Sequence, residues 1–265
     1  MINVVLLGAG NVATHLFKAF TNAEKVTVKQ WYNRNLRTIE KYKTKVAITD
    51  NLEDLVAADI YILAVSDDAV ADLSAQLPFE NRLVVHTSGS VSLYAVDKKH
   101  KRGVFYPLQT FSKAANVDFS DVPLCLEALK NKEDLPILKK LAKAIGSQPH
   151  KVNSDQRAAL HLAAVFVNNF TNQIYRLAHE ITESQGAEFE ILKPLIKETA
   201  RKLDEVSPFL AQTGPAKRND KKTIKKHLKA LTNKHHKDVY QLLTTSIQQT
   251  HGTFVKPKAK SNKKK

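Results

Sequence analysis

Residues 2–13 read INVVLLGAGNVA, an apolar run that leads directly into the pattern Gly8-x-Gly10-x-x-Ala13. This order predicts a buried strand, a tight turn and a helix over about residues 11–20. Gly8 permits the turn, Gly10 lets a ligand approach the backbone, and Ala13 lets the helix lie close to the strand. Because the N-terminus of such a helix favours phosphate, the stretch predicts dinucleotide binding. The alternative is a glycine turn in an α/β domain that binds nothing.

The end of the second predicted strand distinguishes between dinucleotides. Residues 26–32 alternate in polarity and lead into Asn33-Arg34, with Arg37 one turn further on. A site for NAD usually carries Asp or Glu here to bind the ribose hydroxyls. An arginine suits a 2′-phosphate instead, through its planar fork of donors. Asn33, Arg34 and Arg37 therefore predict NADP(H), and the alternative is a pair of solvated arginines at a helix start.

Composition narrows the class of protein. A chain of 265 residues can form two domains. No apolar run reaches the length of a membrane span, and no secretion signal precedes the first strand. The single cysteine, Cys125, lies in the apolar run from Val122 to Leu126, which predicts a buried structural thiol and a reducing cytoplasm. We predict no metal site.

The net charge of +15 raises the question of a nucleic-acid partner. Six lysines lie in the last ten residues, and a second basic cluster runs from Lys217 to Lys229. Aromatic residues for base stacking are not interleaved with either cluster. We therefore expect a solvated tail and no nucleic-acid function, with weak, salt-sensitive polyanion binding by the tail as the alternative.

Strand and helix patterns alternate through the first half of the chain. Further strands are expected near residues 46–48, 59–65, 82–86, 104–111, 124–127 and 150–152, with helices starting at Asn51, after Asp68 and near residue 132. Ligands of parallel sheets bind at the carboxyl ends of the strands. The residues predicted to contact the cofactor there are Gly8, Gly10, Asn11, Val12, Asn33, Arg34, Arg37, Val65, Ser66, Asp67, His86 and Ser88.

From about residue 153 the pattern is helical only. Asn153 or Ser154 is expected to cap a helix that runs to Gly186, and the apolar stretch 158–170 predicts burial on most sides. Within this helix Arg157, His161, Asn168 and Asn172 share one face at about 100° per residue. Buried polar groups need partners, so this stripe is either structural or a ligand site.

The remaining helices are expected over residues 193–206, after Asp220, and over about 236–250. Asp220 is well placed to cap the helix that carries His227. The preceding loop, Thr213 to Asp220 with Arg218, is either an anion-binding turn or a helix connection, and taken alone it favours the connection.

Several segments together resemble a known family. They are residues 8–13, 33–34, 63–67, 86–90, 106–111, 161–165 with Asn168, and 213–215 with Arg218 and Asp220. The chain resembles a two-domain, Rossmann-like, oxidoreductase-related family whose C-terminal helical domain is of unknown function. That family is similar in plan to pyrroline-5-carboxylate reductase, 6-phosphogluconate dehydrogenase and the deazaflavin-dependent NADP oxidoreductases. The resemblance implies a dinucleotide-binding domain and a helical domain that often dimerises, but no substrate.

One departure from related enzymes concerns the proton donor. The β-hydroxyacid dehydrogenases and ketopantoate reductases have a catalytic Lys four residues before an Asn on the long helix. If Asn168 is that Asn, the Lys position holds Ala164. His161, one turn earlier on the same face, is the nearest substitute, because a histidine can serve as a general acid or base near neutral pH.

The combined prediction is an α/β fold, with a Rossmann-type, mostly parallel sheet followed by an all-α domain built on a long interdomain helix. The expected domains are residues 1–152 for the dinucleotide, 153–254 for substrate and dimerisation, and 255–265 as a disordered basic tail. The predicted function is an NADP(H)-dependent oxidoreductase that acts on a small polar substrate in the interdomain cleft. His161, Asn168 and Arg218 are the predicted catalytic residues, and a homodimer is expected through the helical domain. The alternative is a non-catalytic NADP(H) sensor.

Overall fold

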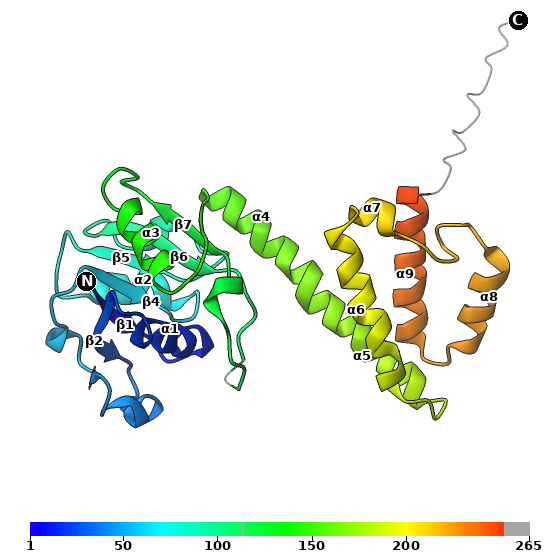
Figure 1. Cartoon of the computed structure of the whole chain (residues 1–265), viewed down its shortest axis with the longest axis horizontal. Coiled ribbons are helices and arrows are strands. Elements are labelled where there is room, and N and C mark those ends of the chain that lie inside the picture. Colours follow the sequence, from blue (N-terminus) through cyan, green and yellow to red (C-terminus); the bar gives the residue numbers. More distant parts are fainter. Residues whose placement is uncertain (113, 252–265) are drawn as a thin grey trace, which may run out of the picture. The chain divides into compact units, whose positions relative to one another are not determined.

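The computed structural model describes residues 1–112 and 114–251. The chain divides into two compact units, Met1–Phe170 and Thr171–Lys265. Figure 1 shows a sheet with flanking helices in the first unit and helices alone in the second. The predicted basic tail, residues 255–265, lies outside the described residues. Among the residues described, no helix is long and apolar enough to cross a membrane.

An eight-stranded sheet forms the centre of the first unit, in the order β3-β2-β1-β4-β5-β6-β7-β8. All neighbouring strands are parallel except β6 and β7. The strands are β1 (Ile2–Leu7), β2 (Val26–Tyr32), β3 (Ala47–Thr49), β4 (Ile60–Leu63), β5 (Leu83–His86), β6 (Lys101–Pro107), β7 (Leu124–Ala128) and β8 (Pro149–Lys151). The predicted Rossmann-type, mostly parallel sheet is confirmed.

Strand β1 is apolar without interruption from Val4 to Leu7, where both of its faces are buried. Val4 and Leu6 face a core shared with helices α1 (Asn11–Thr21) and α3 (Leu135–Ala144). Val5 and Leu7 face the opposite core, to which α2 (Ala69–Gln76) contributes. Parallel strands covered on both faces have no solvent side, so every position favours an apolar side chain. Cys125 of β7 is buried, as predicted for a structural thiol.

The prediction of a helix that begins at Asn51 is wrong. The segment forms only a short 3-10 turn at Leu52–Asp54. The Gln30 amide donates to the Asp54 carbonyl (3.0 Å) and accepts from the Val56 N–H (2.9 Å). The Tyr61 hydroxyl bonds the Val56 carbonyl and the Ala58 N–H. These side chains satisfy backbone groups that a helix would otherwise pair, which leaves the segment extended.

A helical run from Ser154 to Glu183 agrees with the long helix predicted here, and Asn153 caps it in a capping box with Gln156. The run consists of α4 (Ser154–Ala164), a π-helical segment (Val165–Phe170) and α5 (Thr171–Glu183). The predicted domain boundary at residue 153 precedes this run, and the compact units divide within it.

The prediction that residues 158–170 are buried is wrong for a single copy of the chain. The side chains of Leu162 and Val167 are 61% and 74% exposed. Apolar residues lie on every side of this helix, whereas Arg157 is the only residue of 154–170 that is buried.

The other helices are α6 (Lys193–Arg201), α7 (Pro208–Ala211), α8 (Lys221–Ala230) and α9 (Lys234–His251). The helices after Asp220 and near the C-terminus follow the prediction, whereas the helix predicted over 193–206 ends at Arg201 and the short α7 was not predicted. The predicted cap of α8 is confirmed, because Asp220 accepts a hydrogen bond from the Thr223 N–H (3.0 Å).

Candidate functional site

A cavity of about 720 Å³ opens at the carboxyl ends of β1, β2, β4 and β5. Ten of the twelve residues predicted to contact the cofactor line it: Gly8, Gly10, Asn11, Val12, Asn33, Arg34, Val65, Ser66, Asp67 and Ser88. Other lining residues are Tyr32, Thr38, Thr87, Gly89, Tyr106 and His161. The strand order therefore brings segments from residues 8 to 161 together at one edge of the sheet.

The glycine turn forms the floor of this cavity. Gly8 has a positive φ of 108°, and a Cβ there would lie 2.2 Å from the Ala64 carbonyl oxygen. The Trp31 indole N–H donates to the Gly8 carbonyl (2.6 Å) and fixes the turn. A Cβ at Gly10 would meet no heavy atom within 4 Å, so the space above Gly10 is open.

Helix α1 begins at this turn with its N-terminus uncapped. No side chain caps it at Gly10, and its first turn has no acidic residue. Its first N–H groups and the positive end of its dipole are thus available to an anion, and the open space at Gly10 allows a close approach. The residues present fit a dinucleotide pyrophosphate.

Arg34 lies at the rim of the cavity, exposed and without an ion pair among the described residues. The Asn33 side chain donates to the Asn35 carbonyl (2.9 Å) and stabilises the bend after β2. Arg37 is exposed but does not line the cavity, because it lies in the 3-10 turn capped by Asn35. The fit to a 2′-phosphate therefore depends on Arg34, and Thr38 lines the same cavity.

The loops after β4 and β5 are joined on the opposite side of the cavity. The Ser90 hydroxyl donates to the Asp67 carboxylate (2.5 Å). The Ser88 hydroxyl accepts from the N–H groups of Ser90 and Val91, each at 3.1 Å. These bonds give the loops a defined shape before any ligand binds.

The predicted contact between His86 and the cofactor is wrong. His86 is fully buried and does not line the cavity. Its Nδ1 accepts from the Ser88 N–H (3.2 Å), and Nε2 has no hydrogen-bond partner among the described residues. Burial, reinforced by the positive charge of Arg157, lowers the pKa of His86 to about 4. His86 is thus a neutral residue that supports the loop above it.

Tyr106 and His161 meet at the inner end of the cavity. The phenol oxygen lies 3.1 Å from His161 Nδ1, within hydrogen-bond distance. A Cβ at Gly89 would lie 2.7 Å from both His161 Nδ1 and Tyr106 Cζ. Gly89 therefore lets the loop after β5 pack directly on this pair. Tyr106 is not among the predicted site residues, although it begins the segment 106–111 that carries part of the family resemblance.

A second cavity of about 510 Å³ lies on the other side of the pair, also within the first unit. It shares Tyr106 and His161 with the first cavity, and Asn168 and Ala164 line it. Asn168 does not line the cavity of the glycine turn. It belongs to the π-helical segment, where the spacing of 100° per residue does not hold. Arg218 belongs to the second unit, where its N–H bonds the Gly214 carbonyl.

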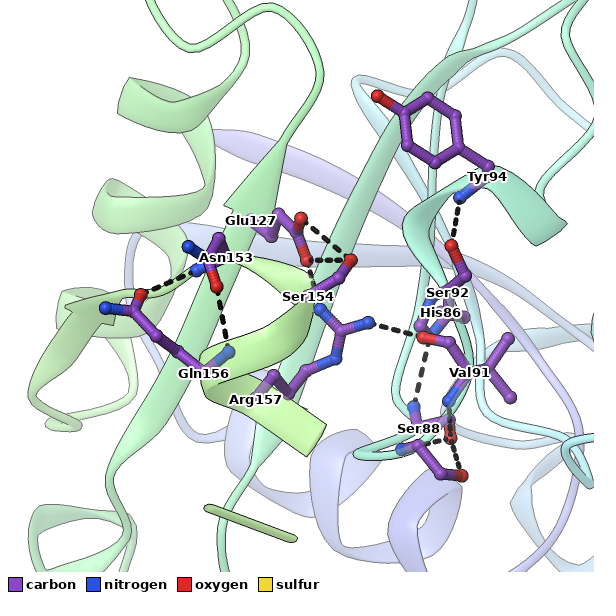
Figure 2. Close-up of polar contacts among 11 residues, drawn as sticks. His86, Ser88, Val91, Ser92, Tyr94, Glu127, Asn153, Ser154, Gln156 and Arg157 are labelled. Atoms are coloured by element: carbon purple, nitrogen blue, oxygen red, sulfur yellow. Dashed lines mark hydrogen bonds and ion pairs between the residues drawn. The ribbon is translucent and has the colours of Figure 1, made fainter. Parts of the chain in front are cut away.

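Helix α4, which carries His161, is anchored by a buried ion pair. The Arg157 guanidinium is 1% exposed and bonds both the Glu127 carboxylate and the Val91 carbonyl (Figure 2). The Ser154 hydroxyl also bonds Glu127, at 3.0 and 3.1 Å. Arg157 is thus the structural member of the predicted polar stripe, because its partners are protein groups.

Comparisons with known proteins agree with this geometry. The family described as coenzyme F420-dependent NADP oxidoreductase matches residues 3–89, and a domain of unknown function (DUF2520) matches residues 122–247. A solved structure from Bacteroides fragilis, assigned provisionally as an NADP oxidoreductase, is 38% identical, with a TM-score of 0.82. The alignment covers 94% of this chain and 98% of that one. The chain belongs to this family of NADP oxidoreductase-related proteins.

More distant solved structures share the fold of the family. A Thermotoga maritima protein is 20% identical over 94% of this chain and 98% of its own, with a TM-score of 0.71. The imine reductase of Myxococcus stipitatus, solved with NADP⁺, is 17% identical over 94% of this chain and 96% of its own, with a TM-score of 0.66. No protein with a curated description matches the chain. The predicted family and its dinucleotide domain of the NADP-oxidoreductase type are confirmed.

Proposed function

We propose that this member of the family is an NADP(H)-dependent reductase or dehydrogenase of a small polar carbonyl or imine compound. The observation that carries the proposal is that one cavity contains the glycine turn, Arg34 and the Tyr106–His161 pair. A phosphate-binding end and a proton-donating end in one cavity are what a hydride-transferring enzyme needs.

The cofactor would be held at two places by the first unit. The N–H groups at the start of α1 would bind the pyrophosphate at Gly10, and Arg34 would bind the 2′-phosphate. When bound, the nicotinamide supplies the hydride. Val65, Ser66 and Ser88 would line its nicotinamide end, and the fixed loops would keep water from the reacting atoms.

The substrate would occupy the second cavity, next to the shared pair. His161 would provide the proton and Asn168 would orient the carbonyl or imine, because both line this cavity. Ala164 also lines this cavity, at the position where the related β-hydroxyacid dehydrogenases have a catalytic lysine. We therefore assign the proton-donating role of that lysine to His161. The predicted role of Arg218, which belongs to the second unit, stays a prediction.

We also propose a homodimer formed through the helical domain. The exposed apolar side chains of Leu162 and Val167 on the long helix support it, because exposed apolar surface favours burial by a second copy. Light scattering of the full chain tests this proposal, and a monomer at micromolar concentration would contradict it.

Binding and turnover are tested separately. Calorimetry with NADPH and NADH establishes whether the cavity binds a cofactor. Oxidation of NADPH is then followed with a panel of aldehydes, ketones, 2-oxo acids and cyclic imines. Reduction of at least one class supports an enzyme, whereas NADPH binding without any turnover supports the alternative, a sensor. His161→Ala should bind NADPH as the wild type does and lose turnover.

A further inference from the structure

Tyr106 joins the two cavities of the first unit at their common wall. Its side chain lines both, as does that of His161, and the two are hydrogen-bonded. Their rings lie edge to face with centroids 6.1 Å apart. Any molecule that spans the two cavities must therefore pass this pair.

The position of the phenol is fixed by the sheet. Tyr106 precedes the last residue of β6, and it is the register partner of Cys125 on β7. Its ring packs in a small core with Leu93, Val104 and Cys125. The other partner, His161, stands one helical turn after Arg157, whose ion pair fixes α4 to β7. The contact thus joins two rigid elements, the geometry that proton transfer requires.

Burial also sets the chemistry of the phenol. Loss of solvent raises the pKa of Tyr106 to about 12, so the hydroxyl keeps its proton at neutral pH. A phenolate at this place is therefore costly, and Tyr106 releases its proton easily only if another group returns one at the same time. His161 Nδ1 is the group within reach.

We infer that Tyr106 is a catalytic residue of the proposed reaction, its hydroxyl passing a proton from His161 to the substrate. The inference rests on the proposed function and changes the role of His161 there, from direct donor to the group that resupplies the phenol.

The hydride adds to the carbon of the C=O or C=N bond, and the π electron pair moves to the oxygen or nitrogen. The Tyr106 O–H gives its proton to that atom while the imidazolium Nδ1–H of His161 gives its proton to the phenol oxygen. The product is an alcohol or amine, Tyr106 remains a phenol, and neutral His161 regains its proton from water. Before that proton returns, neutral His161 has an unprotonated Nδ1, to which the phenol can donate across the 3.1 Å contact.

The test uses Tyr106→Phe, which removes one oxygen and keeps the ring. Tyr94→Phe is the matched control, because the Tyr94 side chain is 66% exposed and lines neither cavity. Three properties are measured in the full chain: NADPH affinity, kcat with a reactive member of the carbonyl and imine panel, and the ¹⁵N shifts of the His161 ring.

We expect Tyr106→Phe to bind NADPH as the wild type does and to lose about 100-fold or more in kcat. The variants His161→Gln and Tyr106→Phe/His161→Gln should lose about as much as each other, because groups that act as a unit are not additive. When the His161 ring is uncharged, loss of the phenol donor in Tyr106→Phe should move its proton from Nε2 toward Nδ1. Tyr94→Phe should leave all three measured properties unchanged.

Two results would overturn the inference alone: a Tyr106→Phe enzyme with kcat within about threefold of the wild type, or unchanged His161 ¹⁵N shifts in that variant. Wild-type protein that binds NADPH but reduces no member of the panel would refute the proposed function, and the donor role with it. Turnover by the wild-type protein therefore distinguishes failure of the proposed function from failure of the Tyr106 inference alone.

Discussion

His86 should make the stability of the first unit depend on pH in a defined window. Its pKa is about 4 in the folded protein, because it is buried and close to the positive charge of Arg157. In the unfolded chain a histidine titrates near 6.5. Between these values the unfolded state binds the extra proton, so the free energy of unfolding falls as the pH falls.

The size of the effect follows from the two pKa values. A difference of about 2.5 pK units corresponds to about 3.4 kcal/mol, present above pH 6.5 and lost as the pH approaches 4. Between pH 7 and pH 4.5 the loss is about 2.4 kcal/mol. Other groups titrate in this range as well, so the effect of His86 appears only as a difference from a variant that cannot be protonated.

His86→Asn supplies this comparison, because an amide oxygen can still accept from the Ser88 N–H. Urea unfolding of both proteins at pH 7 and pH 4.5 gives four free energies. The variant should be less stable at pH 7 and should lose about 2.4 kcal/mol less on acidification. Equal losses in the two proteins would show that His86 takes up its proton in the folded state, and would refute the reasoning.

Three further predictions concern Arg34, Arg157 and the basic residues at the C-terminus. Arg34→Ala should weaken NADPH binding by about 1.5–3 kcal/mol and NADH binding much less, since only NADPH has the 2′-phosphate; calorimetry that shows equal weakening would contradict this. Arg157→Met should lower the free energy of unfolding by about 3–5 kcal/mol, because it leaves the Glu127 carboxylate without its buried partner; a cost below about 1 kcal/mol in urea would contradict it. Deletion of residues 256–265 should leave Tm and NADPH affinity nearly unchanged, and a loss of several degrees would show that the tail docks on the protein.

Much of the fold could be predicted because it depends on local patterns. The run before Gly8 predicts a strand buried on both faces, and the glycine spacing predicts the turn and α1. The missing helix after Asn51 could not be found this way. There Gln30 and Tyr61, both distant in sequence, bond the backbone and hold it extended.

The site was predictable wherever it depends on strand ends, and less so where it depends on packing. His86 lies at the end of β5, but its side chain points to the same face of the sheet as that of Val84, two residues earlier. Val84 faces the core on the α2 side. Alternation along β5 could therefore have placed His86 inside. Tyr106 gave no such signal, because its meeting with His161 depends on how α4 packs against β6, 55 residues away in the chain. Asn168 lies in the π-helical segment and lines the second cavity with His161, but not the cavity of the glycine turn.

The most direct test of the central claim follows the hydride itself. NADPH carrying deuterium on one face of C4 is incubated with the protein and the panel of carbonyl and imine compounds, and products are analysed by mass spectrometry. The account predicts one deuterium in the product from one labelled face only, with transfer lost in Tyr106→Phe and retained in Tyr94→Phe. NADPH binding in the cavity without deuterium in any product would contradict it.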